Sequence, residues 1–235
     1  MSKEVSICVY RRAEQGAPIE QVHSKFISNL KKSSDLIFKD IDWPATPECG
    51  DSLIASYGFN HPRIDGVSFS GHYIFRGESH LYDDKASYDD FFSVRLEFPI
   101  AEIAYSSLLL ETLPELICAF EAYRAIVTID TYDVKLVGLS SNRDPVYSEI
   151  LKTGRDMNGR DNIFTLRPAQ YWDETLCKKA LGYGPEEVIS RLKSSAPKVE
   201  KLSNGVFLVL STDLELTLEQ YLDMNRTFKA LLNLR

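Results

Sequence analysis

The chain has 235 residues, of which 44% are hydrophobic and 26% charged, and its formal net charge is −7 at pH 7. These proportions are typical of a soluble globular protein. The negative charge argues against binding to nucleic acid, which depends on lysine and arginine, and no apolar run is long enough to span a membrane. We therefore expect a cytoplasmic protein with neither a nucleic-acid nor a membrane partner.

The four cysteines, Cys8, Cys49, Cys118 and Cys177, are widely spaced along the chain. None forms a Cys-x-x-Cys pair, and none lies near a histidine at the spacing of a metal site. Free thiols in a reducing compartment are therefore expected, and the sequence predicts no metal ion or other cofactor.

The first part of the chain predicts several strands and one helix. Val5–Tyr10 alternates apolar and small residues, which is typical of a strand. A helix is predicted after Pro18, and its buried side is expected to consist of Val22, Phe26, Ile27 and Leu30. The pairs Trp43-Pro44 and Thr46-Pro47 predict a loop over Asp42–Pro47, from which Trp43 is expected to reach the core. Further strands are predicted at Ser52–Tyr57, Val67–Phe75 and Phe91–Phe98.

Pro99 is predicted to open a helical region that carries several leucines. Within it, Thr112-Leu113-Pro114-Glu115 has the form of a capping box with proline in the first turn. This pattern predicts a break at Thr112 and a second short helix that ends near Tyr123.

The next stretch contains fewer regular elements. Ala125–Leu139 is rich in Val, Ile and Thr and is predicted to form a strand or a hairpin. Ser140–Asn162 is predicted to be mostly loop, with one helical turn near Tyr147–Leu151. Two helices are predicted after it, at Tyr171–Leu181, which ends at Gly182, and at Pro185–Lys193.

The C-terminal part predicts a hairpin followed by an amphipathic helix. Asn204-Gly205 favours a two-residue type I′ turn between strands at Val199–Leu202 and Val206–Leu210. The returning strand has five consecutive apolar residues, so both of its faces should be covered. Thr217-Leu218-Glu219-Gln220 is a capping box, and the helix that follows is expected to bury Tyr221, Met224, Phe228 and Leu231.

The mixture of hairpins and helices predicts an α+β fold. We expect one or more mostly antiparallel sheets with helices packed on one face. The C-terminal hairpin is expected to be followed by a long amphipathic helix. Residues 1–235 are expected to form a single α+β domain, either as one body or as two lobes, 1–123 and 124–235.

A search for catalytic patterns yields one alternative function. His72, His80, Asp83 and Asp84 combine imidazole and carboxylate groups near the end of a predicted strand, as in a metal-dependent hydrolase. Their spacing matches no established ligand pattern. The alternative interpretation is that His72 faces a polar neighbour on a strand and that His80 lies in a turn, with neither residue in a site. Gly154–Asp161 has the glycine spacing of a phosphate loop but lacks its lysine and hydroxyl residue, so a polar surface loop is predicted there.

An acidic, aromatic segment is the candidate surface for a protein partner. From Glu78 to Glu102 the chain has seven acidic and two basic residues, a net charge of −5. Within this window, two Tyr-Asp-Asp triplets place carboxylates beside aromatic rings: Tyr82, Asp83, Asp84, Tyr88, Asp89 and Asp90. Acids steer a basic partner, and tyrosine supplies contact area in protein interfaces. An acidic solvated loop anchored by its aromatic residues is the other interpretation.

Several motifs in the C-terminal half resemble a known family. Pro168–Asp173, Leu181-Gly182, Pro185–Val188, Asn204–Val209 and a closing helix that ends in Leu231-Leu232 resemble the bacterial polymorphic-toxin immunity proteins of the immunity protein 52 family. The resemblance covers the chain from about Arg167 to its C-terminus. In the N-terminal half it extends only to the order of the elements.

The resemblance implies an immunity protein, or antitoxin, that is not an enzyme. Such a protein would bind a cognate secreted nuclease effector of restriction-endonuclease-like fold, with type VI secretion as the expected route, and protect the producing cell from it. A nuclease presents a basic surface to its substrate, which an acidic inhibitor can recognise by charge. We hypothesise that the two Tyr-Asp-Asp triplets contribute to this contact.

Overall fold

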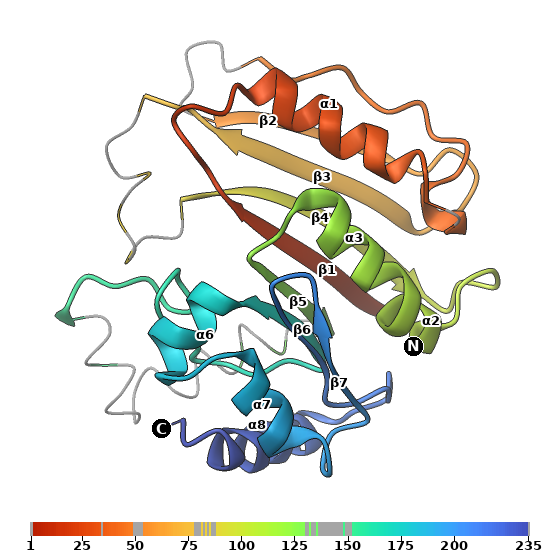
Figure 1. The fold of residues 1–235 in the computed structure, drawn as a ribbon. Coiled ribbons are helices and arrows are strands. Elements are labelled where there is room, and N and C mark those ends of the chain that lie inside the picture. The colour runs from red at the N-terminus through yellow and green to blue at the C-terminus, as the bar shows by residue number, and fades with distance from the viewer. Residues whose placement is uncertain are drawn as a thin grey trace. The chain divides into compact units, whose positions relative to one another are not determined.

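Figure 1 shows a computed structural model of the chain, which describes residues 2–33, 35–48, 54–77, 81, 83, 85, 88–129, 132, 135, 148 and 152–234. The chain divides into two compact units. The first comprises Met1–Tyr82 and Tyr88–Ala125, and the second comprises Asp83–Ser87 and Ile126–Arg235.

The first unit is an antiparallel sheet with helices over one face (Figure 1). Its strands lie in the order β2-β3-β4-β1, and each pairs antiparallel with its neighbour. The elements are β1 (Lys3–Arg12), α1 (Ile19–Leu30), the short 3₁₀ helix η1 (Leu36–Phe38), β2 (Ile54–Asn60), β3 (Val67–Ile74), β4 (Asp89–Phe98), α2 (Tyr105–Ser107), the π-helical turn η3 (Leu108–Thr112) and α3 (Leu113–Phe120). The predicted order of strands and helices is confirmed here, although β2 ends later than expected and the helix predicted to open at Pro99 begins at Tyr105.

Aromatic side chains fill the core of the first unit on the helix side of the sheet. Phe26 of α1 lies 4.9 Å from the ring of Phe92 and 4.8 Å from that of Phe120. Trp43 is buried, and its ring centroid lies 5.5 Å from that of Phe69. The prediction that Trp43 reaches the core from a proline-rich loop is therefore confirmed.

The predicted break at Thr112 is wrong. The chain continues from α2 through η3 into α3, and Thr112 has helical dihedral angles and makes no capping hydrogen bond. Its hydroxyl instead donates to the carboxylate of Asp35. Pro114 lies in the first turn of α3.

The second unit contains β6 (Ala169–Asp173), α6 (Glu174–Leu181), α7 (Pro185–Leu192), β7 (Lys198–Leu202), β8 (Gly205–Val209) and α8 (Leu218–Leu231), while β5 (Arg124–Ile129) spans the point where the chain enters it. β8 pairs antiparallel with both β6 and β7. All five residues of β8 are buried, as its uninterrupted apolar sequence predicted. The predictions for residues 130–151 lie almost wholly outside the described residues.

The predicted helix at Tyr171–Leu181 begins three residues later than expected. Tyr171 and Trp172 belong to β6, where both side chains are buried, and Asp173 then caps α6 by accepting from the N–H of Leu176 at 2.7 Å. Capping by Asp173 satisfies a donor that has no partner within the helix.

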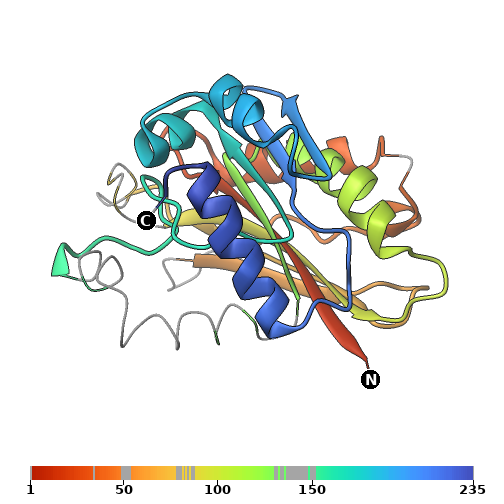
Figure 2. The same ribbon diagram turned by 90° about the horizontal axis from the view of Figure 1, so that it is seen from below.

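The C-terminal hairpin and helix are confirmed, with two corrections. The first concerns the buried side of the helix, because Leu231 is exposed and Leu232 is buried. The second concerns the turn. Ser203 and Asn204 form the turn, with Ser203 at a φ of 50°, and Gly205 is already the first residue of β8, opposite Leu202. The turn therefore lies one residue earlier than the Asn-Gly pattern predicted. α8 lies along one side of the second unit (Figure 2). With antiparallel strands, a closing hairpin and this helix, the α+β fold class is confirmed.

The capping box of α8 supports a prediction on stability. The hydroxyl of Thr217 accepts from the N–H of Gln220 at 3.2 Å, and the Gln220 side chain accepts from the Thr217 N–H at 2.7 Å. Thr217→Ala removes one of these bonds and is expected to cost about 1 kcal/mol in the free energy of unfolding. Urea unfolding would measure this loss. Thr217→Ser keeps the hydroxyl and should stay close to the wild type, and equal losses in both variants would contradict the capping role.

No helix within the described ranges has the length and apolar character needed to cross a membrane.

Candidate functional site

The structure places the residues of the two Tyr-Asp-Asp triplets in different settings. Tyr82 and Asp84 lie outside the described residues. Asp83 is exposed and accepts from the N–H of Lys85 at 2.9 Å, which is a local turn contact. Tyr88 is 50% exposed. Asp83 and Tyr88 belong to different units, and each remains available as a candidate contact by itself.

Asp90 is buried in a cluster of charged groups within the first unit. Its carboxylate accepts two hydrogen bonds of 2.7 Å from the guanidinium of Arg76, and Arg11 lies 3.3 Å from the same group. The N–H of Ile74 also donates to it at 3.2 Å. Arg76 is held in place in turn by the carbonyl of Ala17 at 2.9 Å. The side chain of Asp90 is inaccessible to solvent, so we remove it from the proposed contact surface.

Asp89 is also buried, on the opposite face of β4. The hydroxyl of Tyr123 donates to its carboxylate at 2.5 Å, and burial raises the pKa of Tyr123. The guanidinium of Arg12 lies 3.9 Å from the centre of the Tyr123 ring, and that of Arg124 lies 4.1 Å from the Tyr10 ring. Asp89 therefore belongs to a packed cluster of aromatic and charged groups, and it also leaves the proposed contact surface.

The alternative metal site is not assembled by the described residues. His80 and Asp84 lie outside them, and Asp83 belongs to the second unit while His72 belongs to the first. His72 stacks on Phe91 with ring centroids 5.1 Å apart, and burial lowers its pKa. Within the described ranges, no group of three or more His, Cys, Asp and Glu residues could hold a metal ion.

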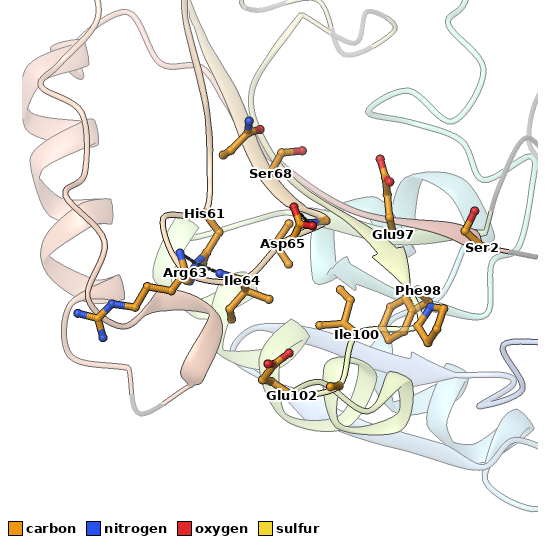
Figure 3. Close-up of a pocket in the computed structure, with 15 residues that line it drawn as sticks. Ser2, His61, Arg63, Ile64, Asp65, Ser68, Glu97, Phe98, Ile100 and Glu102 are labelled. Carbon is orange, nitrogen blue, oxygen red and sulfur yellow. Dashed lines mark hydrogen bonds between the residues drawn. The ribbon is translucent and has the colours of Figure 1, made fainter.

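A groove at one end of the sheet of the first unit was not predicted from the sequence. It has a volume of about 680 Å³ and is formed by the turn between β2 and β3 and by the chain that follows β4. Figure 3 shows the carboxylates of Asp65, Glu97 and Glu102 around it. All three side chains are exposed. Glu97 and Glu102 lie in the acidic window noted above, whereas Asp65 joins them only through the fold.

The arginine that lines the groove, Arg63, is directed elsewhere. Arg63 extends away from the groove (Figure 3) and pairs with Asp40 at 2.7 Å. His61 is buried, and its Nδ1 accepts from the N–H groups of Arg63 at 3.1 Å and Ile64 at 2.9 Å. Burial lowers the pKa of His61, which favours the neutral ring that this acceptor role requires. The groove thus carries three exposed carboxylates, and its arginine is already paired.

Gly66 allows the groove to take this shape. Its φ of 75° is a conformation that glycine adopts without strain, and a Cβ there would lie 3.3 Å from the Cβ of Glu97. The Gly66 carbonyl accepts from the N–H of Glu97 at 2.9 Å. The turn therefore places Asp65 beside the end of β4, where Glu97 is located.

The polar loop at residues 154–162 is closed by its own hydrogen bonds. Asn158, at a φ of 51°, accepts from the N–H groups of Phe164 and Thr165 at 2.8 and 2.9 Å. Asn162 donates to the carbonyl of Asp156 at 2.7 Å, and Arg155 pairs with Asp161 at 2.8 Å. These bonds agree with the predicted loop, although Gly159 and Arg160 within it are buried and not at the surface.

Comparison with known proteins gives one finding on the fold. No protein-family model matches the chain, and no curated protein matches it. Among solved structures, the chain is similar to T6SS protein PA0821 of Pseudomonas aeruginosa, with a TM-score of 0.52 and 10% sequence identity over 97% of this chain and 73% of that one. At this identity the likeness concerns the fold alone.

Proposed function

We propose that the chain is an immunity protein that binds and neutralises a secreted nuclease toxin, and that it acts as an inhibitor and not as an enzyme. The observation that carries this proposal is the groove with three exposed carboxylates in the first unit, a surface suited to a basic protein. The net charge of −7 would attract such a partner from a distance.

Two further observations support the proposal. The C-terminal motifs resemble the immunity protein 52 family, whose members neutralise nucleases of restriction-endonuclease-like fold. The fold is similar to that of a protein named for the T6SS, the expected secretion route of such toxins. A cytoplasmic location follows from the same proposal, because a toxin must be neutralised where its nucleic-acid substrate is.

The groove suggests how inhibition would begin. A nuclease that binds a phosphate backbone presents lysine and arginine side chains, and these can pair with Asp65, Glu97 and Glu102. The pairs would be partly exposed and would therefore mainly increase the rate and specificity of association, with contact area supplied by neighbouring side chains. Tyr88 and Asp83 remain further candidates for contact.

The direct test is size-exclusion chromatography of the chain mixed with the toxin domain encoded beside its gene, with DNA cleavage assayed on the same mixture. A stable complex with cleavage abolished is expected. Separate elution with full cleavage would reject the proposal, and metal analysis of the isolated chain would then address the alternative hydrolase function.

The groove carboxylates give a second prediction. The triple variant Asp65→Asn, Glu97→Gln and Glu102→Gln is expected to bind the toxin about 10-fold more weakly at low salt, since exposed ion pairs contribute up to about 1 kcal/mol each. The loss should shrink as salt is added, because these pairs are screened. Titration calorimetry over a salt series would measure both effects.

The control for this variant neutralises three exposed carboxylates of the first unit that lie outside the groove: Glu14, Asp42 and Glu111. It loses the same amount of charge, so it separates the location of the acids from the net charge. If the two triple variants bind equally, net charge drives association and the groove is not the docking site.

A further inference from the structure

The two edge strands, β2 and β7, differ in how they are protected against pairing with a strand from another chain. β2 ends the strand order of the first unit, and β7 ends that of the second. β7 has the sequence Lys-Val-Glu-Lys-Leu, and its charged side chains form ion pairs, Lys198 with Glu200 and Lys201 with Glu186, both at 3.0 Å. Charges of this kind prevent a foreign strand from pairing with an edge.

β2 has none of these protective features. Its sequence, Ile-Ala-Ser-Tyr-Gly-Phe-Asn, contains no charged residue and no proline. It pairs with β3 in an unbroken register from Ile54 opposite Ile74 to Asn60 opposite Ser68, so no bulge bends it away. A regular, uncharged edge is the kind that accepts another strand.

From residue 55 to residue 60, the outer backbone of β2 has no partner within the described part of the chain. For residues 55–60, the hydrogen bonds run to β3, and none reaches the strand from its other side. Ser56, Gly58 and Asn60 are exposed on the face away from the helices. Ile54 is 40% exposed at the start of the strand. Unpaired N–H and C=O groups along an extended strand are satisfied best by another extended backbone.

The edge continues into the acid-lined groove. Asn60 is the last residue of β2 and also lines the groove, together with the carboxylates of Asp65, Glu97 and Glu102. An extended segment that pairs with β2 would therefore pass beside these carboxylates at the Asn60 end. Basic side chains would be favoured there, because they are attracted to these exposed carboxylates.

We infer that β2 receives an extended, basic segment of the toxin, which adds a strand to the sheet and places lysine or arginine side chains in the groove. The main-chain hydrogen bonds would supply affinity, and the groove would select for charge. This inference rests on the proposed function and names the part of the toxin that is bound.

A second copy of this chain is a poorer occupant of the edge. β2 carries no lysine or arginine, so a copy paired through its own β2 would bring no basic group to the groove. Each copy also carries a net charge of −7, which opposes self-association.

Hydrogen exchange read by mass spectrometry tests the inference on the intact complex. Peptides that cover residues 54–60 are expected to exchange more slowly in the complex than in the chain alone, while peptides that cover β7 should exchange equally in both. A stable complex without protection of β2 would overturn this inference and leave the proposed function intact. Absence of any complex would instead reject the proposed function and the inference with it.

Self-association is detected by the same method. Protection of residues 54–60 that rises with the concentration of the chain alone would assign the edge to a second copy, and would overturn the inference.

A matched pair of lysine variants provides an independent test. Gly58 and Ser70 lie directly opposite each other in β2 and β3, and both are exposed. A Cβ at Gly58 would lie 3.4 Å from its nearest neighbour, so a side chain fits there. Gly58→Lys puts a charge next to the incoming basic strand and is expected to weaken toxin binding about 10-fold more than Ser70→Lys, which lies one strand further away. Equal affinities for the two variants would contradict strand pairing at β2.

Discussion

Replacing Asp90 with asparagine is expected to lower the free energy of unfolding by about 3–5 kcal/mol. The substitution preserves the shape of the side chain but removes its charge, which leaves Arg76 and Arg11 without their anionic partner. Both guanidinium groups are largely buried, so water cannot replace the lost interaction. Removing one member of a buried ion pair costs more than the pair itself contributes, because the remaining charge stays desolvated.

Urea unfolding of the variant and the wild type would measure the loss. Trp43 in the first unit and Trp172 in the second are both buried, so their fluorescence reports on each unit. We expect the Trp43 signal to change at a lower urea concentration, since the whole cluster around Asp90 lies in the first unit.

Asp40→Asn is the matched control for Asp90→Asn. Asp40 also bonds an arginine at 2.7 Å, but its side chain is 60% exposed and that of Arg63 is 69% exposed. An exposed pair contributes up to about 1 kcal/mol, so this variant should stay close to the wild type. If Asp90→Asn were as stable as Asp40→Asn, the buried cluster would not stabilise the fold.

The same pair of variants separates folding from partner binding at this position. Weaker toxin binding by a fully stable Asp90→Asn protein would restore Asp90 to the contact surface. A destabilised protein with wild-type affinity, measured well below its unfolding midpoint, would confirm a structural role.

The two Tyr-Asp-Asp triplets show where inference from sequence stopped. Four acids close together favoured an exposed patch, and Asp83 is indeed exposed. Asp89 and Asp90 are buried because Tyr123, Arg76 and Arg11 come from distant positions in the chain to pair with them. No local pattern around residue 90 reveals these partners. They are arginine and tyrosine side chains, which can donate the hydrogen bonds that a buried carboxylate needs.

The elements with local signals were the ones that could be predicted. The capping box at Thr217 and the five apolar residues of β8 depend on neighbours in sequence, and both are present in the structure. Tyr171 and Trp172 were predicted to begin the helix that ends at Gly182, whereas they belong to β6. Asp173 was the available signal for the true helix start, since aspartate is a preferred N-cap residue.

The groove could be predicted only in part. Glu97 and Glu102 were visible as members of an acidic window, but their meeting with Asp65 depends on the pairing of β3 with β4 and on the turn at Gly66. The openness of the β2 edge was equally hidden, because strand order is a property of the whole sheet. A lack of charge and proline in residues 54–60 was present in the sequence, but it acquires meaning only once the strand is known to lie at an edge.

At position 205, close contact with a neighbouring strand requires glycine. Replacing Gly205 is expected to lower the free energy of unfolding by an amount similar to that for Asp90→Asn. The backbone of β6 passes close to Gly205, and a Cβ there would lie 2.2 Å from the carbonyl oxygen of Trp172 and 2.7 Å from the hydroxyl oxygen of Tyr171. Both distances are shorter than non-bonded atoms tolerate. Gly205→Ala must therefore push β8 away from β6, where Asp173 lies opposite it in the register.

We expect Gly205→Ala to cost about 3 kcal/mol or more, at the upper end of overpacking effects, because the carbonyl oxygen of Trp172 and the Cα of Asp173, 2.8 Å from the added Cβ, belong to the backbone and cannot rotate away. Fluorescence of Trp172, whose own carbonyl is involved, would follow urea unfolding of the second unit. Gly184→Ala is the control, since a Cβ there meets no atom within 4 Å and its φ of −88° suits any residue. Equal stability of the two alanine variants would mean that β6 and β8 can separate at little cost, and that their close approach does not require glycine at position 205.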